Sequence, residues 1–316
     1  MSQIELKIIK KGTETPNVIS ASFFTMNDAY RRFEQYTANL KNFCKLSDIP
    51  GFCTRIYTDD SGQEVALEVA SKYPHVSIIH FNCPEFREEV GHIGTFGTLA
   101  RFLPLFEKGL DLVWVSDIDI PKEFLSTHHI KNMEKSKSDF SFRTFLCYEK
   151  KVYGRKYTIL AGTMISKITF PKQLFTKFVN KIHDLGPVLD RLNQDNSKRN
   201  KPPSKIPFGI DELFINTSLY DYLVRHDVRC LVLKDYASAG RYLRYTGLIT
   251  QDEINLFGKY FVNPTSDLVP RIKRVLSKNI PQVSDENPCL GEVLELMPTF
   301  QKSLHKLYVV KGKELD

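Results

Sequence analysis

The sequence predicts an α/β protein in which a mixed, mainly parallel sheet is flanked by helices. Three observations support this. Strand-like apolar runs alternate with amphipathic, helix-like runs along the chain, which is typical of repeated strand–helix–strand units. Residues 112–115 are all apolar, as in a strand that is buried on both faces. With 316 residues, of which 42% are hydrophobic, the chain can bury a large core.

The first half of the predicted sheet lies between residues 18 and 81. Short apolar runs predict strands, and apolar positions that recur every three or four residues predict helices. Phe33, Tyr36, Leu40 and Phe43 mark one such helix, whose start Asp28 can cap. The predicted strands are 18–24, 54–57 and 76–81, and the predicted helices are 28–43 and 63–72.

The second half follows from the same patterns. The run 97–109 predicts a helix that Pro104 kinks and Gly109 ends. The polar, proline-bearing segment 190–207 predicts a surface loop. The other predicted strands are 112–115, 140–145, 157–165 and 229–233, and the other predicted helices are 170–185 and 211–226.

Composition narrows the classes of function. A net charge of +7 suits anionic ligands such as nucleoside diphosphates. The densest basic run, 197–205, has no aromatic residue for base stacking, so nucleic acid is not an expected partner. No apolar stretch is long enough to span a bilayer and the N-terminus is polar, so we expect a cytoplasmic chain, with peripheral membrane contact left open. None of the six cysteines forms a Cys-x-x-Cys pair, which argues against a zinc site.

Two carboxylates follow the apolar run 112–115. Asp117 and Asp119 stand one residue apart at the predicted carboxyl end of this strand, where ligands bind in open α/β sheets. Two hard oxygen ligands can hold Mg²⁺ or Mn²⁺, with a substrate diphosphate completing the coordination shell. The alternative is structural, because aspartates after strands also make turns and cap helices.

The order of these features resembles that of the GT-A-fold glycosyltransferases, above all the glycogenin-like and bacterial galactosyltransferase-like families. The matching features are the early strand 18–24, Arg101 in a preceding helix, Asp117 with Asp119, Ala161-Gly162, and the acidic pair Asp211-Glu212. The resemblance covers roughly the first three quarters of the chain. It implies a GT-A (Rossmann-like) catalytic domain over 1–235 and a C-terminal extension over 236–316 packed on it.

This resemblance implies transfer of a sugar from a nucleotide-sugar donor, a UDP-sugar, to an acceptor hydroxyl on a glycan, lipid or protein. It implies that Asp117 and Asp119 hold Mn²⁺ or Mg²⁺, and that Asp211 and Glu212 are catalytic. It also implies that the donor diphosphate, ribose and sugar are bound by Arg101, Asp117 and Gly162. The nucleoside would be bound by Ser22, Phe23 and Tyr57. Several of these residues also have a structural alternative: a salt bridge for Arg101, a strand bend for Gly162, a core position for Phe23, and helix capping for the acidic pair.

The chain departs from these families in two ways. It has no His-x-x-Gly-x-x-Lys-Pro-Trp segment, so the third metal ligand is unassigned. Glu212 stands where retaining members often have glutamine, which leaves retention and inversion of the sugar configuration both open. Two other functions are also open: a phosphohydrolase of the haloacid-dehalogenase type with Asp117 as its nucleophile, and a basic binding domain without catalysis.

Overall fold

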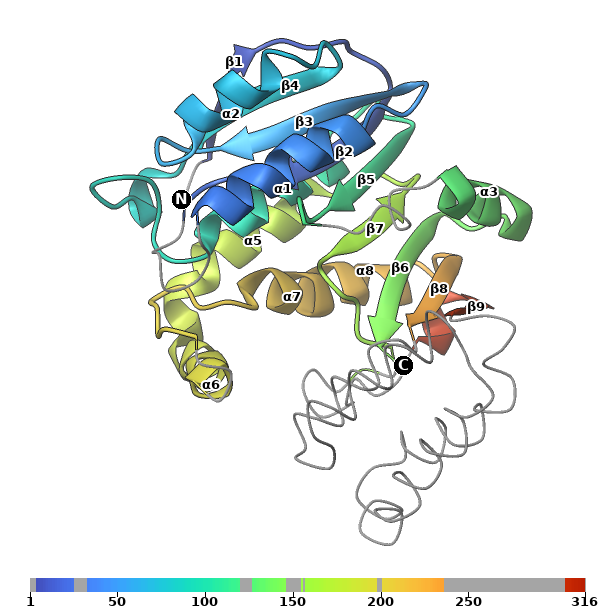
Figure 1. Ribbon diagram of the computed structural model, residues 1–316. Coiled ribbons are helices and arrows are strands. Elements are labelled where there is room, and N and C mark those ends of the chain that lie inside the picture. The colour runs from blue at the N-terminus through green and yellow to red at the C-terminus, as the bar shows by residue number, and fades with distance from the viewer. Residues whose placement is uncertain are drawn as a thin grey trace, which may run out of the picture.

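The computed structural model describes residues 4–25, 33–119, 127–145, 155, 157–197, 201–235 and 305–315 (Figure 1). The strands are β1 (Glu5–Lys10), β2 (Asn17–Ser22), β3 (Phe52–Thr58), β4 (Val76–Asn82), β5 (Leu112–Ser116), β6 (Phe140–Phe145), β7 (Thr163–Ser166), β8 (Cys230–Asp235) and β9 (His305–Val310). The helices are α1 (Phe33–Leu46), α2 (Gln63–Ala70), α3 (Thr127–Ser136), α5 (Lys172–Lys181), α6 (Gly186–Ser197), α7 (Ile210–Phe214) and α8 (Tyr220–Arg225). Short 3-10 segments are η1 (Pro84–Phe86), η2 (Phe96–Phe106), η4 (Ile182–Leu185) and η7 (Gly312–Glu314), and η5 (Ile215–Leu219) is a π-helix.

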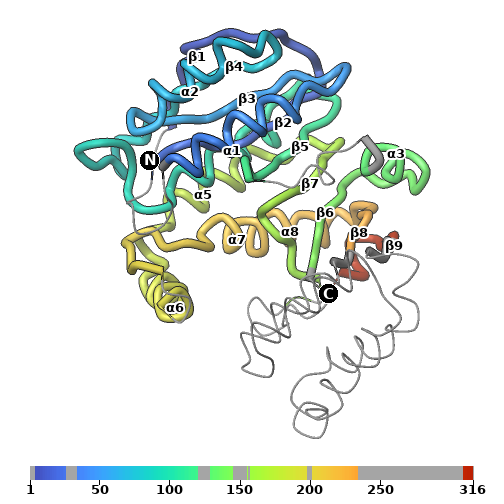
Figure 2. Tube along the Cα trace, in the orientation of Figure 1, coloured from blue at the N-terminus to red at the C-terminus, as the bar shows by residue number. Residues whose placement is uncertain are grey.

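The strands form one mixed sheet in the order β1-β4-β3-β2-β5-β7-β6-β8-β9. Within the described residues, β4–β3, β3–β2, β2–β5 and β6–β8 pair in parallel, and the other four pairings are antiparallel. The predicted mixed α/β architecture with flanking helices is therefore confirmed. The helices α7, η5 and α8 follow one another without a break along one side of the sheet (Figure 2).

Side chains of the central strands alternate between two hydrophobic cores, one on each face of the sheet. On β5, Leu112 and Trp114 belong to the core that includes residues of α1 and α2. Val113 and Val115 belong to the core that includes residues of η2, α5 and α7. Successive side chains of a strand point to opposite faces, and here both faces are buried. This is why β5 appears in the sequence as an unbroken apolar run.

The strand order places a topological switch point between β2 and β5. The chain adds β3 and β4 on one side of β2 and then returns to lay β5 on the other side. In open α/β sheets such a reversal leaves a crevice at the carboxyl ends of the two strands. Ser22 ends β2, and Asp117 directly follows β5.

The predicted loop 190–207 is wrong in its first part, because α6 continues to Ser197. Leu189 on this helix is buried in the core, and Leu192 packs against it. The next inward position is Asn196, which is buried and donates a hydrogen bond from Nδ2 to the Phe208 carbonyl oxygen at 3.0 Å. Because Asn196 is polar, the apolar positions of this segment do not recur with helical spacing, and the helix was not predicted from the sequence.

Other element boundaries also differ from the predictions. The predicted strand 157–165 is formed only from Thr163 onward. The predicted helix 97–109 is a 3-10 helix that ends at Phe106, and Gly109 lies in a left-handed turn with φ +87°. The edge strand β1 was not predicted, although Leu6 and Ile8 alternate with charged residues as in a strand; both side chains are exposed.

The C-terminal part of the chain returns to the sheet. Strand β9 pairs antiparallel with β8, from Cys230 opposite Val310 to Asp235 opposite His305. Residues 236–304, most of the predicted extension, lie outside the described residues. None of the helices that the structure describes has the length and apolar character needed to cross a membrane.

Four of the six cysteines lie in the part of the chain that the structure describes. Cys44, Cys53, Cys83 and Cys230 are buried and unpaired with one another. Burial raises the pKa of Cys44 and Cys230 to about 12 and that of Cys83 to about 11, so these thiols stay protonated and unreactive near neutral pH. Cys147 and Cys289 lie outside the described residues.

The side chain of Asn216 fastens the segment before β7 to the π-helix. Its Oδ1 accepts a hydrogen bond from the Ile159 N–H at 2.8 Å, and its Nδ2 donates to the Ile159 carbonyl at 2.9 Å. Nδ2 also donates to the Glu212 carbonyl at 2.8 Å. Both Asn216 and Ile159 are fully buried. The irregular backbone before β7 thus obtains from one amide the hydrogen bonds that a strand partner would supply.

Replacing Asn216 with leucine is therefore expected to destabilise the fold. Asn216→Leu keeps a similar volume but leaves the buried N–H and C=O of Ile159 without partners. Each such group costs about 1–3 kcal/mol, so we expect the free energy of unfolding in urea to fall by about 2 kcal/mol or more. Ser218→Ala, on the same helix and only half-buried, is the control and should change it by less than about 0.5 kcal/mol. Equal stability of Asn216→Leu and wild type would contradict the role given to this amide.

Candidate active site

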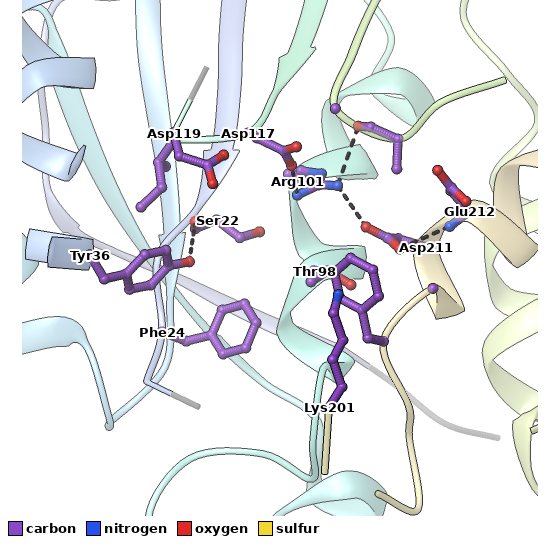
Figure 3. Close-up of a pocket in the computed structure, with 15 residues that line it drawn as sticks. Ser22, Phe24, Tyr36, Thr98, Arg101, Asp117, Asp119, Lys201, Asp211 and Glu212 are labelled. Atoms are coloured by element: carbon purple, nitrogen blue, oxygen red, sulfur yellow. Dashed lines mark hydrogen bonds and ion pairs between the residues drawn. The ribbon is translucent and has the colours of Figure 1, made fainter. Parts of the chain in front are cut away.

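A pocket of about 350 Å³ lies at the carboxyl ends of β2 and β5 (Figure 3). Its wall comes from segments far apart in the sequence: the end of β2, α1, η2, the residues after β5, those before β7, and the entry to α7. The lining residues are Ser22, Phe24, Tyr36, Thr98, Arg101, Asp117, Ile118, Asp119, Ala161, Gly162, Lys201, Phe208, Gly209, Asp211 and Glu212. The structure thus brings together seven of the predicted site residues: Ser22, Arg101, Asp117, Asp119, Gly162, Asp211 and Glu212.

The guanidinium of Arg101 lies at the centre of this site and joins two carboxylates. Nη1 is 2.6 Å from Oδ1 of Asp117, and Nη2 is 2.7 Å from Oδ2 of Asp211. Nη2 also donates to the Ala161 carbonyl oxygen at 3.3 Å. The Arg101 side chain is only 6% exposed. The rigid fork of donors on arginine suits such a bridge between separate acceptors. Arg101 therefore does form the salt bridges that were its structural alternative, and it forms them within the pocket.

The ionisation of this cluster follows from burial and mutual attraction. Burial raises the pKa of Asp211, Arg101 opposes that rise, and the Asp117 carboxylate adds to it. For Arg101, burial lowers the pKa, but the charges of Asp117 and Asp211 more than offset this, so its pKa is raised. The guanidinium therefore stays charged at every pH at which the protein is folded.

The backbone of η2 is fixed behind the guanidinium. The hydroxyl of Ser20, inside β2, donates to the Arg101 carbonyl oxygen at 2.7 Å, and both residues are buried. This bond ties the middle of η2 to the strand whose end borders the pocket. Arg101 is thus held at its backbone by β2 and at its side chain by two carboxylates.

Gly162 lets the backbone before β7 come close to Asp117. The Asp117 N–H donates to the Gly162 carbonyl oxygen at 3.0 Å. A Cβ atom at position 162 would stand 2.9 Å from Oδ2 of Asp117, closer than such contacts normally are. A side chain at position 162 would therefore push the Asp117 carboxylate aside. Gly162 precedes the strand rather than bending it.

Neither acidic residue is the N-cap residue of its helix. The N-cap of α7 is Gly209, with φ +98° and no side-chain capping hydrogen bond. Asp211 Oδ1 accepts the N–H of Glu212 at 2.9 Å, while Oδ2 faces Arg101. The left-handed conformation at Gly209 turns the chain so that both acidic residues border the pocket.

At the other end of the pocket lie Asp119, Ser22 and Tyr36 (Figure 3). Asp119 is exposed. The Tyr36 hydroxyl donates to the Ser22 carbonyl oxygen at 3.4 Å. Among the described residues, neither Oγ of Ser22 nor Nε of Arg101 has a hydrogen-bond partner, although both atoms are buried. Buried polar atoms of this kind normally have partners, so a polar ligand in the pocket is one way to satisfy them.

The structure places Phe23 and Tyr57 away from the pocket, in the two hydrophobic cores. Phe23 points to the opposite side from Ser22 and Phe24, because successive side chains alternate along extended backbone. It stacks on Tyr36 with the ring centroids 4.9 Å apart. Tyr57 is 2% exposed. For Phe23 this is the core position that the sequence already offered as the alternative.

Sequence reasoning missed several lining residues, among them Tyr36, Thr98, Lys201 and Phe208. Phe24 also lines the pocket, on the side that alternation from Ser22 predicts. Lys201 belongs to the basic run first assigned to a surface loop, but its Nζ lies 2.9 Å from the centre of the Phe208 ring, at the edge of the pocket. Cation–π contact of this kind holds a lysine over an aromatic face.

A metal ion would have two protein carboxylates here rather than three. Within the described ranges, no group of three or more His, Cys, Asp and Glu side chains is arranged to hold a metal. Asp117 and Asp119 both line the pocket. Binding through one or two carboxylates, with substrate phosphates and water as the other ligands, is usual for Mg²⁺, so this donor set fits a divalent cation bound together with a diphosphate.

Comparisons with known proteins add little. No protein-family model matches the chain, and no curated protein matches it. Among solved structures, the chain is similar to the glycosyltransferase GlyE of Streptococcus pneumoniae TIGR4, with 13% identity and a TM-score of 0.34 over 84% of this chain. The chain spans 64% of the length of that protein, less than two thirds. So weak a similarity establishes neither fold nor activity for this chain, and the function proposed below rests on the pocket.

Removal of the central guanidinium is expected to destabilise the protein. Arg101→Leu leaves the buried Asp211 carboxylate without its partner, which typically costs about 3–5 kcal/mol of unfolding free energy. Arg225→Leu is the control, because Arg225 is 76% exposed and its contact with Asp221 is 3.8 Å long; it should cost less than about 1 kcal/mol. Urea denaturation of both variants measures the difference.

The loss in Arg101→Leu is also expected to depend on pH. Burial already raises the pKa of Asp211, and without Arg101 it rises further. A raised carboxyl pKa stabilises the folded protein at low pH, and this stabilisation is lost as the pH rises through that pKa. The deficit relative to wild type should therefore be smaller at about pH 5 than at about pH 8. A deficit that is the same at both pH values would show that Asp211 does not depend on Arg101.

Proposed function

We propose that this chain is a metal-dependent glycosyltransferase that moves a sugar from a nucleotide-sugar donor, a UDP-sugar, to an acceptor hydroxyl on a glycan, lipid or protein. One observation carries the proposal. The sequence resemblance named residues that are spread between positions 22 and 212. Seven of them lie in the wall of one pocket, at the switch point of the sheet. Ligands bind at this point in open α/β sheets, and the pocket combines carboxylates, a guanidinium and a close backbone approach.

The charge of the pocket supports a divalent cation as cofactor, Mn²⁺ or Mg²⁺. Four carboxylates (Asp117, Asp119, Asp211 and Glu212) line it, together with two basic side chains, Arg101 and Lys201. Because Arg101 already lies between Asp117 and Asp211, Asp119 is the carboxylate best placed to hold the cation, with Asp117 beside it. When bound, such a cation neutralises charge that develops on a departing nucleoside diphosphate.

The other lining residues suit the remaining parts of the donor. The unpartnered Oγ of Ser22 lies beside Tyr36 and Phe24, where a hydroxyl and aromatic rings would receive the nucleoside. Lys201 would meet the diphosphate from the opposite wall. At Gly162 no side chain separates the backbone from the pocket, which leaves room for the sugar. Asp211 and Glu212 would then act at the sugar carbon that reacts.

The geometry favours this function over the phosphohydrolase alternative. As a nucleophile, Asp117 would need an oxygen free to attack phosphorus. Its Oδ1 is paired with Arg101 at 2.6 Å. An attack by this carboxylate on phosphorus would therefore disturb the ion pair that holds the buried guanidinium. The alternative of a basic domain without catalysis predicts no pocket of this composition.

Binding of nucleoside diphosphate is expected to depend on Asp119. Asp119→Asn removes a charged hard ligand but keeps the shape of the side chain. We expect Mn²⁺-dependent binding of UDP, measured by isothermal titration calorimetry, to weaken at least about a hundredfold, because even residues that only orient metal ligands are worth ten- to a hundredfold. Asp111→Asn is the matched control, since Asp111 is exposed and precedes the amino end of the same strand. Unchanged UDP affinity in Asp119→Asn would refute the proposed metal site.

A further inference from the structure

A buried histidine–aspartate pair lies outside the pocket, just beyond the end of β3. Nδ1 of His92 is 2.9 Å from Oδ2 of Asp59, and both side chains are almost completely shielded from solvent. Neither residue lines the pocket. A carboxylate at such a depth destabilises a protein unless its oxygens have partners, and those partners show what the pair holds in place.

The hydrogen bonds of His92 decide which of its ring nitrogens carries the proton. The backbone N–H of Cys83 donates to Nε2 at 2.9 Å, so Nε2 is an acceptor. A neutral imidazole then carries its proton on Nδ1, from which it donates to Asp59. The ring also contacts the rings of Phe81 and Phe96, with centroids 4.8 and 5.5 Å away. His92 is therefore held as a fixed donor to the Asp59 carboxylate.

The second oxygen of Asp59 extends this chain of hydrogen bonds to the segment that follows β2. Oδ1 accepts the N–H of Ser61 at 3.0 Å and also the Ser61 hydroxyl hydrogen. The hydroxyl oxygen of Ser61 in turn accepts the N–H of Thr25 at 2.9 Å. Gly91, with φ +82°, covers the carboxylate so closely that a Cβ atom there would be 2.8 Å from Oδ2. The chain therefore runs without a break from His92 to the backbone at Thr25.

The hydroxyl of Ser61 takes the place of a strand carbonyl. Beyond the end of β2, the Phe23 N–H still donates to the Tyr57 carbonyl oxygen at 2.8 Å. In a parallel ladder the next donor would be the Thr25 N–H, and its acceptor would be the Asp59 carbonyl oxygen. That oxygen already accepts N–H groups at the start of α2. Ser61 thus supplies the acceptor that the turn into α2 removes.

Phe24 stands between these two backbone anchors and lines the pocket (Figure 3). Because the peptide bond between Phe24 and Thr25 is planar, the bond from Thr25 to Ser61 fixes the orientation of the backbone that carries the Phe24 ring. On its other side the ring packs against Gly97 of η2, where a Cβ atom would be only 2.6 Å from it. The place of this ring in the pocket wall depends on both contacts.

We propose that this chain of hydrogen bonds positions the Phe24 ring for the nucleoside of the donor. Its members His92, Asp59 and Ser61 are positioning residues, which affect binding through Phe24 without lining the pocket themselves. The inference rests on the proposed function, which assigns this end of the pocket to the nucleoside. Loss of the chain therefore weakens the binding of a ligand that reaches Phe24 and leaves the binding of a diphosphate alone unchanged.

The first experiment changes Ser61, which contacts Thr25 directly. Ser61→Ala removes the hydroxyl and Ser61→Thr keeps it. Ser71→Ala is the matched control, because Ser71 is exposed at the other end of α2. Isothermal titration calorimetry with Mn²⁺ measures the affinity for UDP and for methyl diphosphate, which has the same diphosphate but no nucleoside. Hydrogen exchange of the ligand-free protein, read by mass spectrometry, reports on the Thr25 amide.

We expect Ser61→Ala to bind UDP about three- to tenfold more weakly, the worth of one hydrogen bond, and methyl diphosphate as wild type does. Its Thr25 amide should exchange faster. Ser61→Thr should restore both UDP affinity and exchange, and Ser71→Ala should change neither. A purely structural role for Ser61 would not separate the two ligands in this way.

A second pair of variants tests His92, at the far end of the chain. The amide nitrogen of asparagine reaches about as far as Nδ1, so His92→Asn can still donate to Asp59. The amide oxygen of glutamine reaches about as far as Nε2, so His92→Gln keeps only the bond from Cys83. Both variants lose the ring contacts. We expect His92→Gln to bind UDP at least about threefold more weakly than His92→Asn does.

Several results would overturn the inference. These are wild-type UDP affinity in Ser61→Ala, equal weakening of UDP and methyl diphosphate, or equal UDP affinity in the two His92 variants. Failure of the proposed function looks different, because wild type itself would then bind no UDP with Mn²⁺. The role for the nucleoside would fall with it, whereas unchanged exchange of the Thr25 amide in Ser61→Ala would overturn the chain of hydrogen bonds itself.

Discussion

One buried guanidinium organises the candidate site. Arg101 reaches from η2 to Asp117 after β5, to Asp211 in α7 and to the backbone before β7. A charge at this depth is tolerated only with well-placed partners, and these partners come from elements up to 110 residues away in sequence. The positions of the strand end, the helix and the irregular segment relative to one another are therefore tied to a single side chain.

The surrounding contacts keep that side chain and its partners in place. Ser20 holds the backbone of Arg101 against β2, and Gly162 allows the chain to pass close to Asp117. Asn216 fastens Ile159 to the helix that carries the acidic pair. Each of these groups is buried or closely packed, so the geometry of the pocket is fixed before any ligand arrives. Such preorganisation is what electrostatic catalysis requires.

Sequence periodicity predicted the central strands and several of the helices, because these elements bury regular apolar faces. It failed where polar groups do the packing: Asn196 hid the end of α6, and Asn216 holds an irregular segment where a strand was expected. The site residues Asp117, Asp119 and the acidic pair could be named because strand ends and helix starts carry ligand-binding groups. Lys201 and Tyr36 could not, since their places in the pocket depend on how distant segments fold together.

The most direct test of the account is a crystal structure of the protein with UDP and Mn²⁺, using the anomalous signal of manganese to locate the ion. The account predicts the ion on Asp119, the diphosphate between it and Lys201, and Arg101 still joined to Asp117 and Asp211. Nucleotide bound at another surface, or manganese away from Asp119, would contradict it.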